Sequence, residues 1–277
     1  MKRTSSLRIF ADSDSSPTQT AAIDHALTLI IPAYNEENRL PATLESVRDD
    51  LDDWGVDYRV VVVDNGSRDK TRLLSKKFGR RFSTICQPVA GKGAAVRKGM
   101  LQATGEVVAF TDADLPYDLF AIRNGYQKIR CGQADVVYGS RSIDGAEIAV
   151  KRRWIRSLAS FAFRCIARQL ISKTVADTQC GLKLFSNQAA RRIFSRTTID
   201  GFAFDTEVVF LAEFLHLKGS IIPVTLINED ESTLSLRRHT LPMLRDMFSV
   251  RWRAWRDGYS TGNPIESVRQ PADRRAA

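Results

Sequence analysis

Short apolar runs alternate with helical stretches through the first half of this chain, and the alternation limits what it can fold into. Runs with the length and β-branched composition of strands lie at 27–31, 58–63, 83–87, 106–112 and 134–140. The helical stretches between them lie at about 37–51, from about 69, at 91–102 and at about 117–130. Repeated β-α-β units predict an α/β fold, with a mostly parallel, Rossmann-like sheet and helices on both faces. Ligands of such sheets bind beyond the carboxyl ends of the strands, here in the loops after residues 31, 63, 111 and 139.

The second half of the chain has a less regular pattern. We expect a long basic helix, an extended segment, a helix, a strand and a final helix, at about 150–172, 180–186, 205–217, 220–227 and 240–257. The length of 277 residues suits one large domain, which we place at 25–258. Polar composition predicts a disordered leader at 1–24 and a disordered tail at 259–277.

Composition narrows the classes of partner. The formal net charge of +9 favours an anionic partner, whether nucleic acid, anionic lipid or a phosphorylated substrate. The four cysteines are far apart and form no metal-binding pattern with the histidines, so we expect reduced thiols in the cytoplasm. We find neither a signal peptide nor a run of about 18 apolar residues, so any membrane contact is expected to be peripheral.

Asp112-Ala113-Asp114 closes the fourth apolar run, in the context FTDAD. Two carboxylates one residue apart can share Mg²⁺ or Mn²⁺, which takes few protein oxygens and completes its shell with phosphate and water. Such an ion offsets the negative charge of a diphosphate leaving group. A pair of this kind is also typical of a solvated turn. Its position directly after a buried strand favours the metal site.

Polar and aromatic residues follow the first two runs as well. Tyr34 suits stacking on a nucleobase and Glu36 suits donors on a base or ribose, although the same segment also suits a capped helix start. The segment at 64–67, DNGS, adds acceptors beside the same place or forms only a tight turn. Gly91-Lys92-Gly93 opens a helix whose N-terminus favours an anion, without the spacing of a P-loop.

The segments IPAYNEE, VVVDNGSRDKT, GKGAAVRKGM and TDAD, in this order and spacing, resemble the family 2 glycosyltransferases with the GT-A fold. The later segments GSR, DTQCGLKLF and GFAFDTEVVF are similar to those of polyprenyl-phosphate sugar synthases, and most to the dolichyl-phosphate β-glucosyltransferases. The resemblance spans roughly residues 27–257. It implies a metal-dependent hexosyltransferase that takes a nucleotide-sugar, foremost UDP-glucose, and a polyprenyl phosphate acceptor.

The resemblance also implies a role for each matching residue. The donor nucleotide would contact Pro32, Tyr34, Glu36, Asp64, Asn65, Lys92, Asp112 and Ala113. The metal would be held by Asp112 and Asp114. The acceptor phosphate would be received by Arg141, Arg156 and Ser160. The catalytic candidates beside the sugar are Asp177 with the loop of Gln179, and Asp205 and Glu207 supporting that wall.

Three positions depart from the family pattern. Asn65 stands where many relatives carry a second Asp, and Pro116 stands where some synthases place a metal-binding Gln. The Ser-Lys pair usual before the last helix reads Ser232-Thr233 here, and Arg237 or Arg238 could supply the missing cation.

Two segments predict basic amphipathic helices. In the first, one side carries Arg153, Arg156, Ser160, Arg164 and Arg168, with apolar residues opposite. In the last helix an apolar stripe, with arginines beside it, comprises Leu241, Leu244, Phe248, Trp252 and Trp255. Cationic helices with Trp and Phe suit the cytoplasmic face of an anionic membrane. The alternative is that both stripes pack on the core and the arginines face water.

The expected reaction needs little base catalysis. A lipid monophosphate is already largely dianionic at neutral pH, so it requires neutralisation and aiming before an in-line attack that inverts the anomeric centre. Alternatives remain: a GDP-mannose-dependent polyprenyl-phosphate mannosyltransferase, a transferase with a soluble or polysaccharide acceptor, and a non-catalytic module that binds nucleotides or nucleic acid. Nucleic acid is disfavoured, because the aromatic residues lie on one helical stripe and not along a basic groove.

Overall fold

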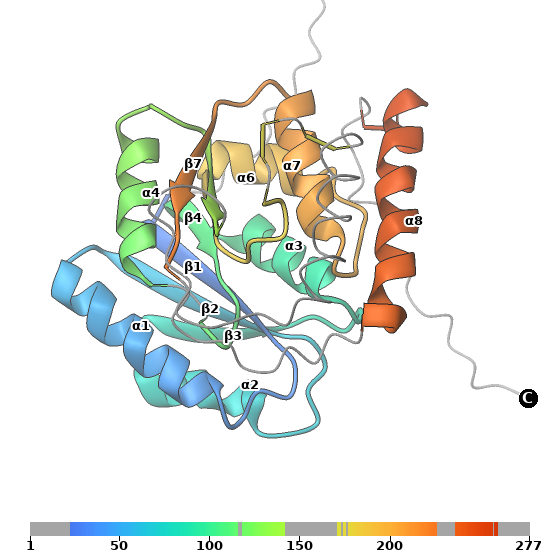
Figure 1. The fold of residues 1–277 in the computed structure, drawn as a ribbon. Coiled ribbons are helices and arrows are strands. Elements are labelled where there is room, and N and C mark those ends of the chain that lie inside the picture. The colour runs from blue at the N-terminus through green and yellow to red at the C-terminus, as the bar shows by residue number, and fades with distance from the viewer. Residues whose placement is uncertain are drawn as a thin grey trace, which may run out of the picture.

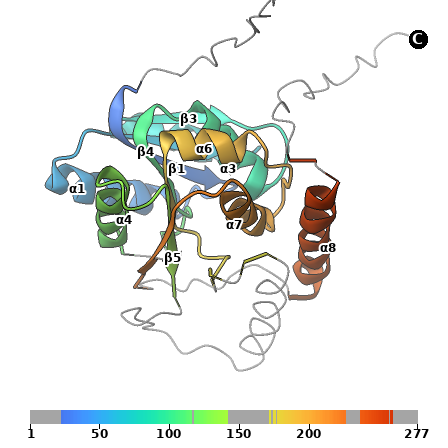
Figure 2. The same ribbon diagram turned by 90° about the horizontal axis from the view of Figure 1, so that it is seen from above.

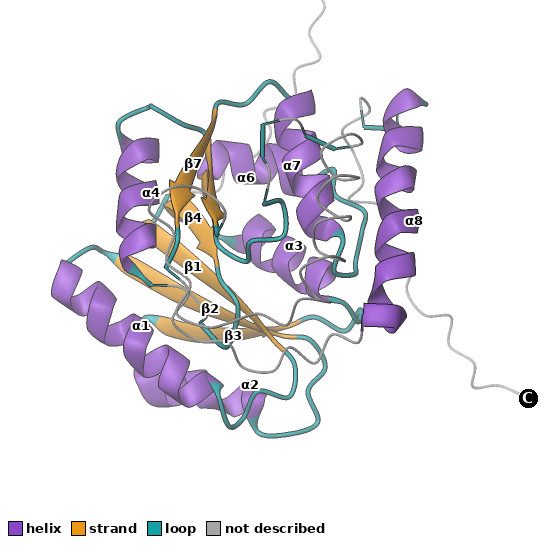
Figure 3. Ribbon diagram, viewed as in Figure 1, coloured by secondary structure: helices purple, strands orange, loops and turns teal. Residues whose placement is uncertain are grey.

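The computed structural model describes residues 23–115, 118–141, 171–172, 174–175, 177–225, 236–256 and 258–259. Most of the expected leader, tail and first basic helix lies outside the described residues. The same holds for the named positions Pro116, Arg156, Ser160, Ser232 and Thr233, and for the side chains of 236–244. Within the described chain, helices cover both faces of one sheet (Figure 1; Figure 3).

The elements follow the expected alternation closely. The strands are β1 (His25–Ala33), β2 (Tyr58–Asp64), β3 (Phe82–Cys86), β4 (Gly105–Phe110), β5 (Val136–Ser140), β6 (Lys183–Ser186) and β7 (Gly219–Pro223). The helices are α1 (Leu40–Trp54), α2 (Thr71–Leu74), the 3₁₀ helix η1 (Ser75–Phe78), α3 (Lys92–Gln102), α4 (Phe120–Arg130), α6 (Asn187–Phe194), α7 (Phe204–Phe214) and α8 (Leu236–Trp255).

The strands form a seven-stranded sheet in the order β3-β2-β1-β4-β6-β5-β7. All neighbouring pairs are parallel except those of β6, which runs antiparallel to both β4 and β5. The prediction of a mostly parallel α/β sheet is confirmed. Because β6 runs the other way, its first residue, Lys183, pairs with Phe110 near the carboxyl end of β4. The segment before β6 therefore reaches the edge where parallel sheets bind ligands.

Two features differ from the expectations. Helix α6 was not predicted, although Ser186 precedes it and its side chain accepts a hydrogen bond from the Ala189 amide, as an N-cap residue does. Tyr259, the first residue of the expected tail, is 1% exposed and belongs to the core.

The core has two apolar layers, one on each face of the sheet. Alternate residues of β1 divide between them, with Leu29 and Ile31 on one face and Ile30 on the other. Helices α1 and α4 cover the first layer, and α3, α6 and α7 cover the second (Figure 2).

Helix α8 lies outermost, beyond α7 (Figure 2). It buries Met247 and Val250 against the second layer. The described part of the expected apolar stripe faces solvent, since Phe248, Trp252 and Trp255 are 58%, 56% and 82% exposed. In this helix the alternative that the stripe packs on the core is wrong for these three residues. Among the helices of the described chain, none is long and apolar enough to cross a bilayer.

Candidate active site

The loops singled out by the sequence meet at one edge of the sheet. The end of β1 pairs with the end of β2, Ala33 opposite Asp64, and β4 runs along the other side of β1. The residues that follow these strands therefore lie side by side. The parallel pairing, and not any contact close in sequence, brings Tyr34, Asp64 and Asp112 to the same edge.

The acidic pair after β4 lies against the start of α3. The Nζ atom of Lys92 is 2.5 Å from Oδ1 of Asp112. Burial would lower the pKa of Lys92, but the Asp112 and Asp205 carboxylates outweigh it and raise that pKa, so the ammonium stays charged. Burial and the neighbouring Asp112 raise the pKa of Asp114. The Lys92 ammonium and the two carboxylates therefore form one charged cluster at this edge of the sheet.

The Asp112–Asp114 pair fits a divalent cation. The Oδ1 atom of Asp114 is buried and has no hydrogen-bond partner among the described residues. A buried acceptor left unpaired is costly, and a ligand would relieve that cost. The described residues contain no group of three or more His, Cys, Asp or Glu suited to a metal. Two carboxylates completed by phosphate oxygens and water match Mg²⁺ or Mn²⁺.

The backbone around the acidic pair forms a turn and is tightly packed by neighbouring segments. Leu115 has a φ of 41°, an unusual value for a residue other than glycine, and its amide closes a turn on the Asp112 carbonyl at 3.1 Å. Gly181, just before β6, lies against the Asp112 side chain, where an added Cβ would be 2.2 Å from Oδ2. Ala113 is buried, and its carbonyl accepts the Thr43 hydroxyl hydrogen bond at 2.6 Å.

The expected nucleoside contacts have unequal surroundings. Tyr34 is 54% exposed, so its ring is available for stacking. Asp64 is buried and accepts a hydrogen bond from the Ser67 amide at 3.1 Å. Glu36 is paired with Arg39, whose Nε and NH2 atoms lie 2.8 and 3.0 Å from its oxygens. Pro32 is half-buried within β1.

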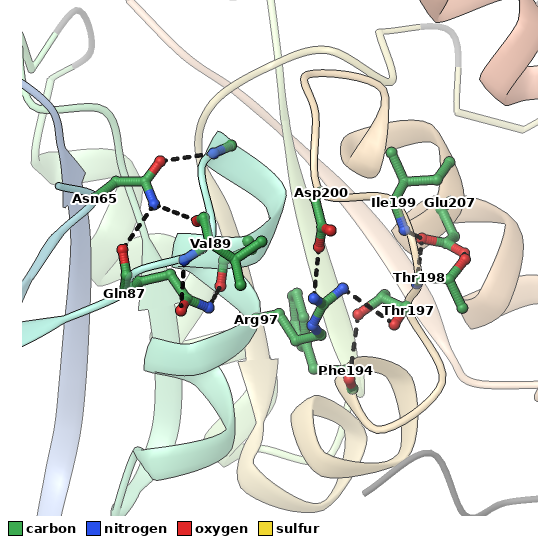
Figure 4. Close-up of polar contacts among 12 residues, drawn as sticks. Asn65, Gln87, Val89, Arg97, Phe194, Thr197, Thr198, Ile199, Asp200 and Glu207 are labelled. Atoms are coloured by element: carbon green, nitrogen blue, oxygen red, sulfur yellow. Dashed lines mark hydrogen bonds and ion pairs between the residues drawn. The ribbon is translucent and has the colours of Figure 1, made fainter. Parts of the chain in front are cut away.

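Asn65 fastens the end of β2 to the loop before α3 (Figure 4). Its Nδ2 donates to the carbonyls of Gln87 and Val89 at 3.2 and 2.7 Å, and its Oδ1 accepts from the Gly91 amide at 2.7 Å. A carboxylate has no N–H to donate to those carbonyls. The departure from the family pattern at this position therefore has a structural reason, since the amide both donates and accepts.

Arg141 and Asp177 form a close pair beyond β5. The backbone amide, Nε and NH2 of Arg141 donate to the Asp177 carboxylate at 3.1, 2.8 and 2.8 Å. Burial would raise the pKa of Asp177, but these contacts with Arg141 outweigh it and lower that pKa. Asp177 is thus an ionised carboxylate that orients a guanidinium. The other expected acceptor residues, Arg156 and Ser160, lie outside the described residues.

The segment between Asp177 and β6 touches both halves of the site. Gly181 contacts Asp112, while the Leu182 carbonyl accepts the Gly139 amide hydrogen bond at 3.0 Å beside the start of the GSR segment. The Nε2 atom of Gln179 is buried without a hydrogen-bond partner among the described residues. This segment therefore connects the Asp112 side chain with the Arg141–Asp177 pair.

Lys183 is a residue that the sequence reasoning did not single out. It is fully buried, and its Nζ donates to Asp205 at 2.5 Å and to the Cys180 carbonyl at 2.7 Å. The pair ties the segment before β6 to the start of α7. A lone lysine within the apolar run LKLF was the available signal, because lysine is almost never fully buried without a partner.

Glu207, expected to support the wall beside the sugar, is fully buried at the base of the loop 197–203. Its carboxylate accepts hydrogen bonds from Thr198 and Ile199 (Figure 4). It therefore positions that loop and makes no contact with solvent.

The sequence matches one family model and several named relatives. The model of the family described as glycosyl transferase family 2 matches residues 28–194. A dolichyl-phosphate β-glucosyltransferase from Dictyostelium discoideum is 31% identical over 242 residues, covering 82% of this chain and 74% of the relative. One from Drosophila melanogaster is 33% identical over 250 residues, covering 83% and 77%.

Solved structures share the fold at low identity. Glucosyl-3-phosphoglycerate synthase from Mycobacterium tuberculosis, in complex with Mn²⁺, UDP and its product, has a TM-score of 0.62 at 16% identity, covering 82% of this chain and 78% of that one. Mannosyl-3-phosphoglycerate synthase from Rubrobacter xylanophilus has a TM-score of 0.62 at 15% identity, covering 90% and 78%. With a family match over more than half its length and relatives above 30% identity, this chain belongs to glycosyl transferase family 2 and is a glycosyltransferase.

Proposed function

We propose that this protein transfers glucose from UDP-glucose to a polyprenyl phosphate of the dolichyl type at an anionic membrane surface. The observation that carries the proposal is that the segment before β6 touches two charged groups. Gly181 lies against Asp112, which pairs with Lys92, and Asp177 at the start of the segment binds Arg141. The names of the relatives, dolichyl-phosphate β-glucosyltransferases, support the choice of sugar and acceptor.

On the donor side, Asp112 and Asp114 would hold Mg²⁺ or Mn²⁺, which supplies positive charge to the diphosphate as it leaves. The unpartnered Asp114 oxygen supports this assignment. Lys92, 2.5 Å from Asp112 at the start of α3, brings a second positive charge to the same phosphates. Tyr34 stacks on the base, and Asp64 and Asn65 border the nucleoside.

On the acceptor side, Arg141 receives the lipid phosphate and Asp177 fixes the direction of its guanidinium. The role expected for Asp177, orienting the acceptor or the sugar, becomes in this proposal that of orienting Arg141. Because Arg141 holds the pKa of Asp177 low, this carboxylate is a poor proton acceptor. The dianionic phosphate is itself the nucleophile. One of its oxygens forms the bond to the anomeric carbon as the bond to the nucleoside diphosphate breaks on the opposite side, which inverts that centre.

The exposed face of α8 supports action at a membrane. Phe248, Trp252 and Trp255 project from the outermost helix, with the Arg256 guanidinium 4.7 Å from the Trp252 ring. Exposed aromatic residues beside cations suit the headgroup region of an anionic bilayer.

A donor screen tests the proposed function. The full chain is incubated with a short polyprenyl phosphate, Mn²⁺ or Mg²⁺, and UDP-glucose, GDP-mannose or another UDP-sugar, and the lipid product is read by mass spectrometry. We expect a glucosyl lipid from UDP-glucose, lost with EDTA and in Asp114→Ala but retained in Asp49→Ala, a carboxylate on α1 with a 68% exposed side chain. A mannosyl product would replace the proposed donor, and sugar transfer only to soluble acceptors would contradict the proposed lipid substrate.

A further inference from the structure

We propose that Tyr259, just beyond α8, is a positioning residue for the donor nucleotide. Through Glu207 it holds the loop 197–203 against the Gly91-Lys92-Gly93 turn, and so fixes the place of the Lys92 ammonium. The inference rests on the proposed donor role of Lys92.

The first link is the carboxylate of Glu207, which is fully buried. Its Oε2 accepts hydrogen bonds from the amides of Thr198 and Ile199 at 2.9 and 2.8 Å. Its Oε1 accepts from the Thr198 hydroxyl and the Tyr259 hydroxyl, both at 2.7 Å. Hydrogen bonds to an ionised acceptor are stronger than neutral ones, so the loop and Tyr259 share one strong anchor.

The second link joins this loop to the start of α3 (Figure 4). Arg97 of α3 donates to the Asp200 carboxylate at 2.5 Å and to the Thr197 carbonyl at 3.3 Å. The Asp200 carbonyl accepts from the Ala94 amide at 3.2 Å. Each residue from Thr197 to Asp200 thus contacts either Glu207 or α3.

The two segments approach without spare room. An added Cβ at Gly91 would be 2.1 Å from the Asp200 carbonyl oxygen, and one at Gly93 would be 2.3 Å from that of Ile199. Glycine at both positions permits the backbones to touch. A shift of the loop therefore displaces the turn between these glycines, which carries Lys92 toward or away from Asp112.

The third link is Tyr259 itself. Its ring packs near Phe210 and Phe214 of α7, with centroids 6.1 and 6.3 Å apart, and its carbonyl accepts from Nε of Arg196 at 3.3 Å. Removing only the hydroxyl leaves this packing in place. Among the described residues, the Glu207 carboxylate then loses the one hydrogen bond that fixes it from outside the loop and keeps only the Thr198 and Ile199 contacts and the Arg253 guanidinium 3.6 Å away. The carboxylate and the loop bound to it are therefore held less firmly, while the fold remains.

The test compares Tyr259→Phe with Tyr58→Phe as a matched control. Tyr58 is equally buried, and its hydroxyl also donates to a carboxylate, Asp52 at 2.9 Å, but it lies at the start of β2, away from the site. The full chain with Mn²⁺ is titrated with UDP by calorimetry, and KM is measured for donor and acceptor. We expect Tyr259→Phe to weaken UDP binding and raise donor KM about five-fold, which is the effect expected from the loss of one hydrogen bond. The acceptor KM is expected to stay unchanged.

A second variant and the wild-type chain separate the outcomes. Glu207→Gln, which keeps the shape but lowers the charge of the anchor, is expected to show the same donor-selective change, whereas Tyr58→Phe is expected to bind UDP as the wild type does. The inference is overturned if Tyr259→Phe binds UDP as tightly as the wild type does, as Tyr58→Phe is expected to. An equal fall of the unfolding temperature in the two variants would then show that the Tyr259 hydroxyl contributes only to stability. If the wild-type chain itself binds no UDP, the proposed function fails first, and the inference with it.

Discussion

The Asp177 carboxylate receives three hydrogen bonds from Arg141, and this contact decides what both residues can do. A guanidinium held in this way has a fixed orientation, which suits phosphate recognition. Both oxygens of the Asp177 carboxylate accept hydrogen bonds from Arg141. In the proposed reaction Asp177 would therefore act through Arg141 and would take no proton from the nucleophile.

The contact has a stability consequence that depends on pH. Arg141, with Lys183 as a further cation nearby, lowers the pKa of Asp177 in the folded state. The ionised Asp177 carboxylate therefore adds to the free energy of unfolding above its unfolded pKa of about 3.9. This contribution is lost as the pH falls through the lower pKa of the folded state. Asp177→Asn is expected to lower the free energy of unfolding by about 2 kcal/mol at pH 7. Urea unfolding of both chains checks this, and the difference should shrink as the pH drops below about 4. A difference that is independent of pH would contradict the assignment.

Individual residues were only partly predictable. Asp112, Asp114 and Asp64 could be named as candidates, because carboxylates after apolar strands are a local signal. The contacts of Asn65, Lys183 and Tyr259 were not predicted, because each depends on a partner distant in sequence: Val89, Asp205 and Glu207.

Among the elements, α8 shows what a helical spacing pattern can predict and what it cannot. The spacing placed Phe248, Trp252 and Trp255 on one stripe, and all three face solvent, but spacing alone does not say whether a stripe faces protein or solvent. Met247 and Val250 supply the inward face, which frees Phe248, Trp252 and Trp255 to face outward. Strand β6 was expected only as an extended segment, because its direction depends on pairing with β4 and β5.

The outward face of α8 predicts lipid binding. Phe248→Ser with Trp252→Ser is expected to reduce binding to anionic vesicles at least ten-fold, because two exposed aromatic side chains leave the bilayer. Co-sedimentation measures this, with neutral vesicles and higher salt as the comparison. Leu73→Ser on α2 is the control, since Leu73 is as exposed as Trp252, each at 56%. Equal vesicle binding by wild type and double variant would contradict a docking role for this face.

At the scale of the whole molecule, the order of strands and helices was predictable from composition and period, because parallel β-α-β units leave few arrangements. The site is a product of that arrangement. The strand order places β1 between β2 and β4, and the reversal of β6 brings the segment from Asp177 to Gly181 to the same edge. A sequence pattern can indicate which residues belong to such a site. Which of them contact one another depends on the order and direction of the strands in the sheet.

The central claim is that Asp112 and Asp114 hold a divalent cation that carries a nucleoside diphosphate. Calorimetric titration of the folded chain with UDP, with Mn²⁺ and then with EDTA, tests it most directly. We expect saturable binding that requires the metal and is weakened at least ten-fold in Asp114→Asn, which removes one charged ligand. No binding heat for UDP with either Mn²⁺ or Mg²⁺, or equal binding with EDTA, would contradict the account.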